Sequence, residues 1–443
     1  MTSEASPAAP ASANGRSRLR GYWPLAALLL GLALGAASGG LSQGAREATL
    51  STAQFVGTLW LNALKMTVIP LVVALLIVGV ARGAEAVQGG RVAARSVLWI
   101  VILCTASSIF GAAAIMLLAG ILPLPRATAG SLQGALASVE QKASGPLPGI
   151  SEFFQNIVPD NVVAAASNGD VLPLVVFAML FALALTRLPA DRRATVVNLF
   201  SVIADALLVI IGWVLWIAPV GVFALAYSVG AAAGGAAFAG LGHYVLLISV
   251  VGILVTLAAY PLAIIAGRLR PGTFARGMVG PQTVAISTRS SLASLPAMLA
   301  AARAIGIREQ VADVTLPISV ALFRATGPAM NTAVAFYVAH WLGLEPTIGQ
   351  MIAAIAVGAV MSYGAVSLPG EVSFISSIAP IAMALGAPIA PLALLVAVEM
   401  VPDIFRTVGN VTMDVAVTAT VARRSGFAEE DSEEDRLLRS DGA

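Results

Sequence analysis

The chain has 443 residues, of which 58% are hydrophobic and only 11% are charged, and its formal net charge is +2. Soluble domains carry about 25% charged residues, so this chain lacks the polar surface that a water-soluble globule of its size needs. The small net charge excludes a basic nucleic-acid-binding face, and the single cysteine, Cys104, excludes an intramolecular disulfide framework. The mean hydropathy of +0.90 instead predicts a polytopic membrane protein.

The two ends of the chain differ in composition from the apolar region between them. Residues 1–20 are rich in alanine, serine and proline, and residues 425–443 are acidic. Such segments cannot bury enough apolar surface to fold, so we predict that both tails are disordered. The apolar run that begins at residue 21 is too long for a signal peptide, which predicts that it is retained as the first span.

Ten apolar segments follow in chain order, and the first six are predicted to be membrane spans because a span needs about 20 residues. These six cover residues 21–42, 53–81, 95–123, 157–186, 196–228 and 240–267, and proline and glycine break the fourth of them. From residue 272 onward, glycine, proline, serine and charged residues interrupt the apolar pattern. In this region we predict two continuous helices, 311–340 and 387–422, and two segments broken near the middle, 277–303 and 350–384.

The two broken segments point to a particular kind of membrane protein. Their breaks fall at residues 290–296 and 367–371, and a broken helix cannot face lipid because its free N–H and C=O groups would have no partners. Paired breaks in corresponding halves are typical of inverted-repeat transporters with re-entrant hairpins. We therefore predict an all-α membrane protein with eight transmembrane helices, two re-entrant helical hairpins and inverted repeats.

Clusters of arginine determine the predicted orientation. They lie at residues 16–20, 82–95, 187–193, 268–276, 303–308 and 423–424. If the first hairpin re-enters from the cytoplasm and the second from outside, every cluster lies on the cytoplasmic side, as the positive-inside rule requires. We therefore expect a multi-pass protein of the inner (cytoplasmic) membrane with both termini in the cytoplasm.

The last predicted helix carries a row of polar residues at membrane depth. Glu399, Asp403, Arg406, Asn410 and Asp414 are spaced by four, three, four and four residues, which places all five on one stripe of a helix. Ionisable groups inside a membrane are rare and usually functional. A paired polar seam between two helices is the alternative, but five polar groups beside two broken hairpins favour a lined cavity.

The chemistry of this stripe suits a small anionic ligand. The guanidinium of Arg406 offers a fork of donors to a carboxylate, and the Asp403 carboxylate can hold an ammonium group. Helix N-termini at a hairpin tip favour anions, which suggests that Ser290 and Ser291 bind a second carboxylate. A simple hairpin turn is the alternative explanation for these two serines.

At these residues the chain resembles the glutamate/aspartate transporter family, that is, the dicarboxylate/amino acid:cation symporters, over about residues 21–424. Residues 403–414 resemble the family's D-x-x-R-T-x-x-N-V-x-G-D, residues 288–296 resemble T-R-S-S-S-x-T-L-P, and residues 364–370 resemble its G-x-x-x-x-P-G tip. Further support comes from Leu64-Lys65-Met66 with Pro70, and from residues 218–223.

The resemblance implies a homotrimer with a glutamate-transporter-like elevator fold. Residues 21–270 would form mainly the scaffold and trimer contacts, with the third and sixth spans joining a transport domain whose core is residues 271–424. The substrate-binding residues implied by position are Arg289, Ser290, Ser291, Leu368, Pro369, Gly370, Asp403, Arg406, Thr407 and Asn410. Asp414 and the backbone near Asn410 would belong to a cation site, so Asp414 is the candidate for a residual sodium site.

Two departures from the family concern the coupling ion. The family's N-M-D-G-T falls on residues 323–327, which read Phe-Arg-Ala-Thr-Gly, and apolar side chains stand at third-span ligand positions, namely Ile100, Leu103 and Cys104. Hard cations require several oxygen ligands, so we expect at least one conventional sodium site to be absent. We hypothesise that Arg324 lies near Asp414 or Glu399 as a built-in cation and that protonation of Glu371 or Glu399 replaces sodium. Alternatively, Arg324 reaches a water-filled crevice.

We therefore expect a secondary active symporter that imports an acidic amino acid or C4-dicarboxylate without any cofactor. Coupling to protons, or weak coupling to sodium, is favoured because the usual sodium-site motif is altered. A non-transporting solute sensor or an anion channel of the same fold is the alternative. A membrane enzyme is disfavoured, because the only two histidines, His243 and His340, have no plausible ligand partner in the sequence.

Overall fold

The computed structural model describes residues 23–88, 91–124, 130, 158–168, 170–322, 324–362 and 370–424. Every regular element within these ranges is a helix, which confirms the predicted all-α fold. The tails that we expected to be disordered, residues 1–20 and 425–443, lie outside the described ranges.

The helices follow the order of the predicted segments. The first half of the chain contains α2 (Trp23–Ala37), η1 (Ser38–Gly40), α3 (Gln43–Gln88), α4 (Arg91–Ile121), α7 (Val162–Asn168), α8 (Val171–Leu185), α9 (Ala190–Trp216) and α10 (Ala218–Ala233). The second half contains α11 (Ala236–Pro261), a π-helical turn η2 (Leu262–Ala266), α12 (Pro271–Thr288), α13 (Ser291–Ala304), α14 (Glu309–Leu322), α15 (Thr326–Trp341), α16 (Ile348–Met361), α17 (Gly370–Ala384), α18 (Ala390–Leu395) and α19 (Met400–Arg424).

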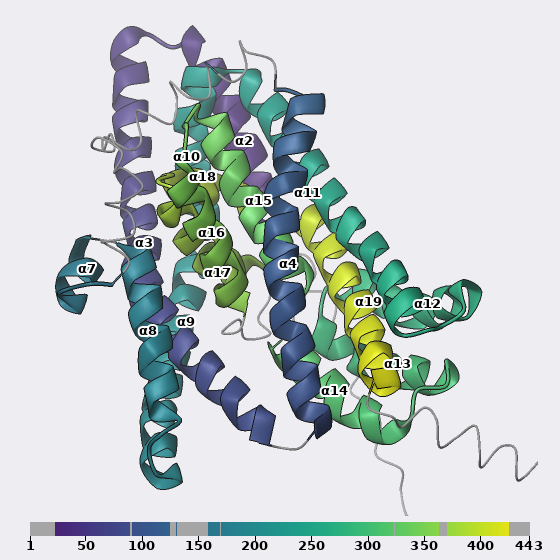
Figure 1. Cartoon of the computed structure of the whole chain (residues 1–443). Coiled ribbons are helices and arrows are strands. Elements are labelled where there is room, and N and C mark those ends of the chain that lie inside the picture. Colours follow the sequence, from purple (N-terminus) through teal and green to yellow (C-terminus); the bar gives the residue numbers. More distant parts are fainter. Residues whose placement is uncertain are drawn as a thin grey trace, which may run out of the picture.

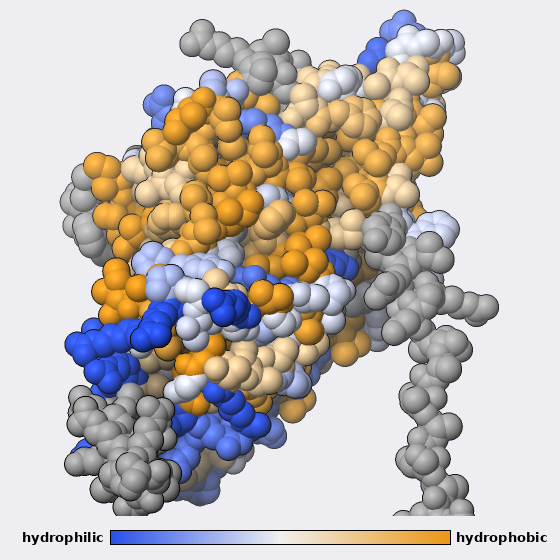
Figure 2. Space-filling model, turned by 90° about the vertical axis from the view of Figure 1, so that its right-hand side faces the viewer, coloured by the Kyte–Doolittle hydropathy of each residue, from blue (hydrophilic) through white to orange (hydrophobic). Residues whose placement is uncertain are grey.

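The surface of the molecule is suited to lipid. Within the described part of the chain, five helical stretches are long and apolar enough to cross a membrane: α2 with η1, α3, α4, α9, and α11 with η2. Large apolar side chains point outward from them; Trp213 and Trp216 on α9 are 68% and 78% exposed. Figure 2 shows a broad hydrophobic region next to a hydrophilic end of the molecule. A surface of this kind is solvated by hydrocarbon rather than by water.

The helices pack in two groups. In Figure 1, α3, α8 and α9 of the first group lie on the left, and α11, α12, α13 and α19 of the second lie on the right. In the first group α8, α9 and α10 pack against α3, and α2 packs against α10. In the second group α4, α11, α12, α13, α14 and α15 surround α19, while α16 and α17 pack against α15. The two groups meet where α3 contacts α4 and α17. The division into a static scaffold and a mobile transport domain stays a prediction.

Two helices that we predicted as continuous are broken, and that prediction was wrong. The first divides into α14 and α15, and the second divides into α18 and α19. A proline stands four residues beyond each break: Pro328 follows Arg324, and Pro402 follows Val398. In a helix, the ring of a proline clashes with the carbonyl group four residues earlier, so a break at these points removes the clash.

Both predicted hairpins consist of two helices that pack against each other, α12 with α13 and α16 with α17. The first pair is joined at Arg289, which ends α12 in a left-handed conformation with φ 51°. Ser290 then caps α13, because its Oγ accepts a hydrogen bond from the N–H of Ala293 at 3.2 Å. The tip of the second pair, residues 363–369, lies outside the described residues.

Glycines bring the backbones of α2 and α10 close together. A Cβ atom added at Gly31, Gly35 or Gly230 would lie only 2.2–2.6 Å from a carbonyl oxygen of the facing helix. Between helices in lipid, association depends on such close van der Waals packing, since the surrounding hydrocarbon is as apolar as the side chains. The three glycines therefore hold the first helix of the chain against the first group.

We expect Gly230→Ala to destabilise the protein, because the added Cβ would lie 2.4 Å from the carbonyl oxygen of Leu32. Overpacking costs about 1–3 kcal/mol, so the midpoint of thermal unfolding of the detergent-solubilised protein should fall. Gly242→Ala on α11 is the matched control, since no atom lies within 4 Å of a Cβ added there. Equal midpoints for the two variants would contradict the close α2–α10 contact.

Candidate functional site

The polar stripe of α19 is buried inside the second group of helices. Asp403, Arg406, Asn410 and Asp414 are each between 0% and 7% exposed. Glu399, which is 1% exposed, lies in the turn before α19, and its carbonyl oxygen accepts a hydrogen bond from the N–H of Asp403 at 2.9 Å. The structure thus gathers five polar side chains in one buried stripe.

Arg406 forms a buried ion pair within this stripe. Its Nη2 lies 2.5 Å from Oε1 of Glu399, and Oε2 of Glu399 accepts a hydrogen bond from the hydroxyl of Tyr244 on α11 at 2.8 Å. The Nε–H of Arg406 is also buried, and it has no hydrogen-bond partner among the described residues. A buried donor without a partner costs free energy, so this edge of the guanidinium is prepared to receive a ligand carboxylate.

Asp403 lies one turn before Arg406 and is surrounded by positive charge. The guanidinium groups of Arg406, Arg289 and Arg324 all interact with its carboxylate electrostatically. Two of these groups belong to distant parts of the chain, since Arg289 joins α12 to α13 and Arg324 precedes α15. Sequence reasoning paired Asp403 with Arg406 alone and missed the other two contributions, because they come from distant parts of the chain.

Asn410 joins α19 to the start of α15. Its Oδ1 accepts a hydrogen bond from the N–H of Thr326 at 2.9 Å, and the hydroxyl of Thr326 lies 2.5 Å from the same oxygen and 2.6 Å from the carbonyl oxygen of Arg406. Sequence reasoning did not single out Thr326. The Asn410 side chain therefore satisfies a free N–H group at the beginning of α15, a structural role besides the predicted one in binding.

The hydroxyl groups of Ser290 and Thr407, two of the residues predicted to contact substrate, are engaged in local hydrogen bonds. The Oγ of Ser290 caps α13, as described above, and Ser291 begins that helix; both residues are half-buried. The hydroxyl of Thr407 donates to the carbonyl oxygen of Asp403 at 2.9 Å. The capping role of Ser290 is the one that a simple hairpin turn requires, so a substrate contact by this serine stays a prediction.

Asp414 is completely buried, and both of its carboxylate oxygens lack hydrogen-bond partners among the described residues. Its charge interacts electrostatically with Arg324 and with Cys104 of α4. Cys104 and Ile100, which stand where the family has oxygen ligands, are buried as well. Arg324 acts electrostatically on Asp414 and is not among the groups that act on Glu399. The role of Arg324 as a built-in cation and the absence of a conventional sodium site stay predictions.

Four predicted residues fall at the edge of what the structure describes. Leu368 and Pro369 lie outside the described residues, while Gly370 begins α17 and Glu371 follows it in the first turn. The structure describes the backbone of these last two residues and not their side chains. Their roles in binding and coupling stay predictions.

Comparison with known proteins agrees with the architecture. A family model described as the sodium:dicarboxylate symporter family matches residues 23–424. The proton/glutamate-aspartate symporter of Escherichia coli (strain K12) is 27% identical, with 83% of this chain and 84% of that protein covered. The neutral amino acid transporter B(0) of Oryctolagus cuniculus is 28% identical, covering 88% and 76%. A C4-dicarboxylate transport protein of Laribacter hongkongensis (strain HLHK9) is 25% identical, covering 83% and 82%.

The family match spans almost all of the described chain, and the family consists of transporters. Membership of a family of membrane transporters explains why the outer surface of the protein is apolar and why the sequence contains few charged residues. It also agrees with the apolar helices and the buried polar stripe. The chain belongs to the sodium:dicarboxylate symporter family, and it is an integral membrane transport protein and not an enzyme.

Proposed function

We propose that the protein is a symporter that imports an acidic amino acid or a C4-dicarboxylate across the cytoplasmic membrane. The observation that supports this most directly is the buried guanidinium of Arg406, whose Nε–H has no partner while Nη2 is held by Glu399. Held at one end, the guanidinium keeps a fixed orientation, and a carboxylate can use its remaining N–H groups as a bidentate pair.

The names of the relatives cover acidic amino acids, C4-dicarboxylates and neutral amino acids. The fixed guanidinium of Arg406 favours a substrate that carries a second carboxylate in addition to the α-carboxylate of an amino acid. Asp403, one turn away, would bind the amino group of such a substrate, with Thr407 and Asn410 nearby. The junction of α12 and α13, together with the Gly370 region, would close over the α-carboxylate.

The charges of the site favour a proton as the coupling ion. Arg406 and Glu399 neutralise each other, so a substrate carboxylate that binds Arg406 adds one negative charge to a buried site, which is costly. A proton on Glu399 would remove that excess charge and weaken the ion pair that competes with the substrate. Among the described residues, the groups that act on Glu399 are Arg406, Asp403 and Tyr244.

Arg324 would act as a permanent replacement for a sodium ion. Its guanidinium interacts electrostatically with Asp414, whose oxygens have no hydrogen-bond partners in the described chain. A fixed positive charge beside this carboxylate supplies what a bound cation would supply, so sodium binding would be unnecessary or weak. Like its relatives, the protein would work without an enzymatic cofactor.

The proposal extends to the architecture. The second group of helices, which holds the polar stripe, would move as the transport domain of an elevator, and the first group would form the scaffold of a homotrimer. Eight spans, two re-entrant hairpins and cytoplasmic termini would complete this topology. A solute sensor or an anion channel of the same fold is a weaker candidate, because relatives along most of the chain are named as symporters or transport proteins.

Uptake into proteoliposomes tests the proposal. Purified protein should accumulate radiolabelled aspartate, glutamate or succinate above the external concentration when an inward proton gradient is applied. A channel would only equilibrate the substrate, and a sensor would not move it. Uptake equal to that of empty liposomes for all acidic candidates would refute the proposed function.

Arg406→Lys should weaken the binding of acidic substrates by about 1.5–3 kcal/mol, the range for hydrogen bonds to charged groups. Lysine keeps the charge but cannot reproduce the planar fork of donors. The measurement is the half-saturating concentration for aspartate and for succinate in proteoliposome uptake. Unchanged values for every acidic substrate would place Arg406 outside the binding site.

Asp403→Asn should distinguish between substrates with and without an amino group. Removing the carboxylate charge should reduce uptake of aspartate and glutamate, since their ammonium group loses its counter-charge, while uptake of succinate is largely spared. Equal losses for aspartate and succinate would mean that Asp403 has a structural role, or that the natural substrate has no amine.

Replacing sodium by choline should leave wild-type uptake largely intact, and uptake should be faster at pH 6 than at pH 8, because acid favours the protonated form of Glu399. The double variant Arg324→Met/Ala325→Asp should gain sodium dependence, since it removes the fixed cation and adds a carboxylate. Arg324→Met alone is the control for loss of the cation without the new ligand. Strict sodium dependence of the wild type would refute this model of coupling.

A further inference from the structure

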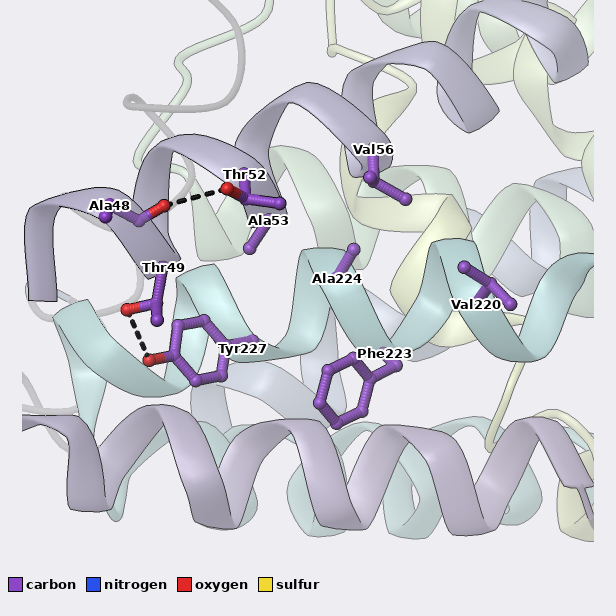
Figure 3. Close-up of a pocket in the computed structure, with 9 residues that line it drawn as sticks. All are labelled: Ala48, Thr49, Thr52, Ala53, Val56, Val220, Phe223, Ala224 and Tyr227. Atoms are coloured by element: carbon purple, nitrogen blue, oxygen red, sulfur yellow. Dashed lines mark hydrogen bonds between the residues drawn. The ribbon is translucent and has the colours of Figure 1, made fainter. Parts of the chain in front are cut away.

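A groove between α3 and α10 lies in the first group of helices, apart from the polar stripe of α19 (Figure 3). Its volume is about 540 Å³, within the range of small-molecule sites. Nine residues line it: Ala48, Thr49, Thr52, Ala53 and Val56 from α3, and Val220, Phe223, Ala224 and Tyr227 from α10.

The hydroxyl groups in the groove already have hydrogen-bond partners. Tyr227 donates to Oγ1 of Thr49 at 2.9 Å, and Thr49 donates to the carbonyl oxygen of Arg46 at 3.0 Å. Thr52 donates to the carbonyl oxygen of Ala48 at 2.8 Å (Figure 3). The remaining lining side chains are apolar, so the groove offers a hydrocarbon surface without a demand for further polar contacts.

The groove opens onto an exposed apolar surface of the molecule. Phe55 and Leu59, on the same stretch of α3, are 70% and 62% exposed, and Val220 at the groove itself is 61% exposed. Further along, the two helices close against each other, because Trp60 packs on the backbone of Gly221 and Leu225 packs on that of Gly57. The groove is therefore closed at one end and bordered by exposed apolar side chains along its side.

The opposite end of the groove carries a positive charge. Arg46 lies one turn before Thr49 on α3 and is exposed, and its Nη2 donates to the carbonyl oxygen of Ala231 at 3.2 Å. This bond uses one of the five N–H donors of a guanidinium, and it holds the Arg46 side chain against the last turn of α10.

The length of this arrangement matches one leaflet of a bilayer. Arg46 and Val56 are ten residues apart on one helix, which corresponds to about 15 Å at 1.5 Å per residue. The hydrocarbon core of a bilayer is about 30 Å thick. An apolar groove of this length with a guanidinium at its outer end has the dimensions and polarity of a phospholipid.

We propose that this groove binds one phospholipid, with an acyl chain between α3 and α10 and the headgroup phosphate on Arg46. In the groove, the acyl chain of the lipid contacts a fitted apolar surface in place of neighbouring lipid chains. The guanidinium of Arg46 forms a charge-assisted hydrogen bond with the phosphate. A lipid held there would fill the space between α3 and α10 near the end where α2 joins α3.

Native mass spectrometry of the full chain in detergent tests the proposal, with dioleoyl phosphatidylglycerol as the titrated probe. The wild type should retain one lipid per chain with higher affinity than any further lipid. Arg46→Gln should weaken this binding about tenfold, the equivalent of one charge-assisted contact, and Arg46→Lys should lose less. Ala53→Phe should block the site by filling the groove.

Two matched controls and two partial ligands separate the alternatives. Arg187→Gln and Ala113→Phe, at exposed positions outside the groove, should retain the lipid as the wild type does. Dioleoylglycerol, which lacks the phosphate, should bind weakly, and Arg46→Gln should not change its affinity. Glycerol phosphate, which lacks the acyl chains, should not compete with phosphatidylglycerol for the groove.

Equal lipid retention by Arg46→Gln, Ala53→Phe and the wild type would overturn the proposal. A change of oligomeric mass in Ala53→Phe with unchanged lipid retention would also overturn it, because the groove would then be a contact between copies of the chain.

Discussion

A positive charge in the interior of a membrane protein needs an anionic partner, because an isolated buried charge is very costly. Arg406 meets this requirement through Glu399, which lies seven residues earlier in the turn before α19. Tyr244 of α11 holds the second carboxylate oxygen of Glu399, so the same ion pair also fixes how α11 packs on α19. One edge of the guanidinium is left without a partner in the described chain. The proposed substrate contact of Arg406 therefore uses the part of a buried charge that its ion pair with Glu399 leaves unpaired.

The apolar pattern predicts most of the fold but not where the last helices break. The first hairpin could be predicted because serine and proline interrupt an apolar run, and the structure turns the chain at Arg289 and Ser290. The breaks before α15 and α19 were missed because hydropathy does not register the steric effect of Pro328 and Pro402 on a carbonyl group one turn earlier. Proline alone does not decide the matter, since α3 continues through Pro70. Tertiary contacts, such as the bonds from Thr326 to Asn410, help to decide which prolines end a helix.

Helical spacing also predicted which side chains of α19 share a face, but it could not assign their partners. Glu399 and Asp403 lie on the same stripe, so the sequence gives no reason to pair Arg406 with the more distant carboxylate. Tyr244 and Thr326 bond to the stripe from other helices, and their positions in the sequence do not indicate that they are close to it. For Arg324, the replacement of a cation ligand by an arginine predicts a position near the cation site, and an electrostatic influence on Asp414 is consistent with that position.

The glycine contact between α2 and α10 has a consequence for biogenesis. Gly230 lies 198 residues after Leu32, the residue that it contacts. At about 5–20 residues per second, the ribosome needs roughly 10–40 s to synthesise the intervening chain. During this delay α2 resides in the bilayer without its packing partner, and its glycine face is covered by acyl chains. That face exposes no polar side chain, so lipid can occupy it until α10 is inserted and displaces it.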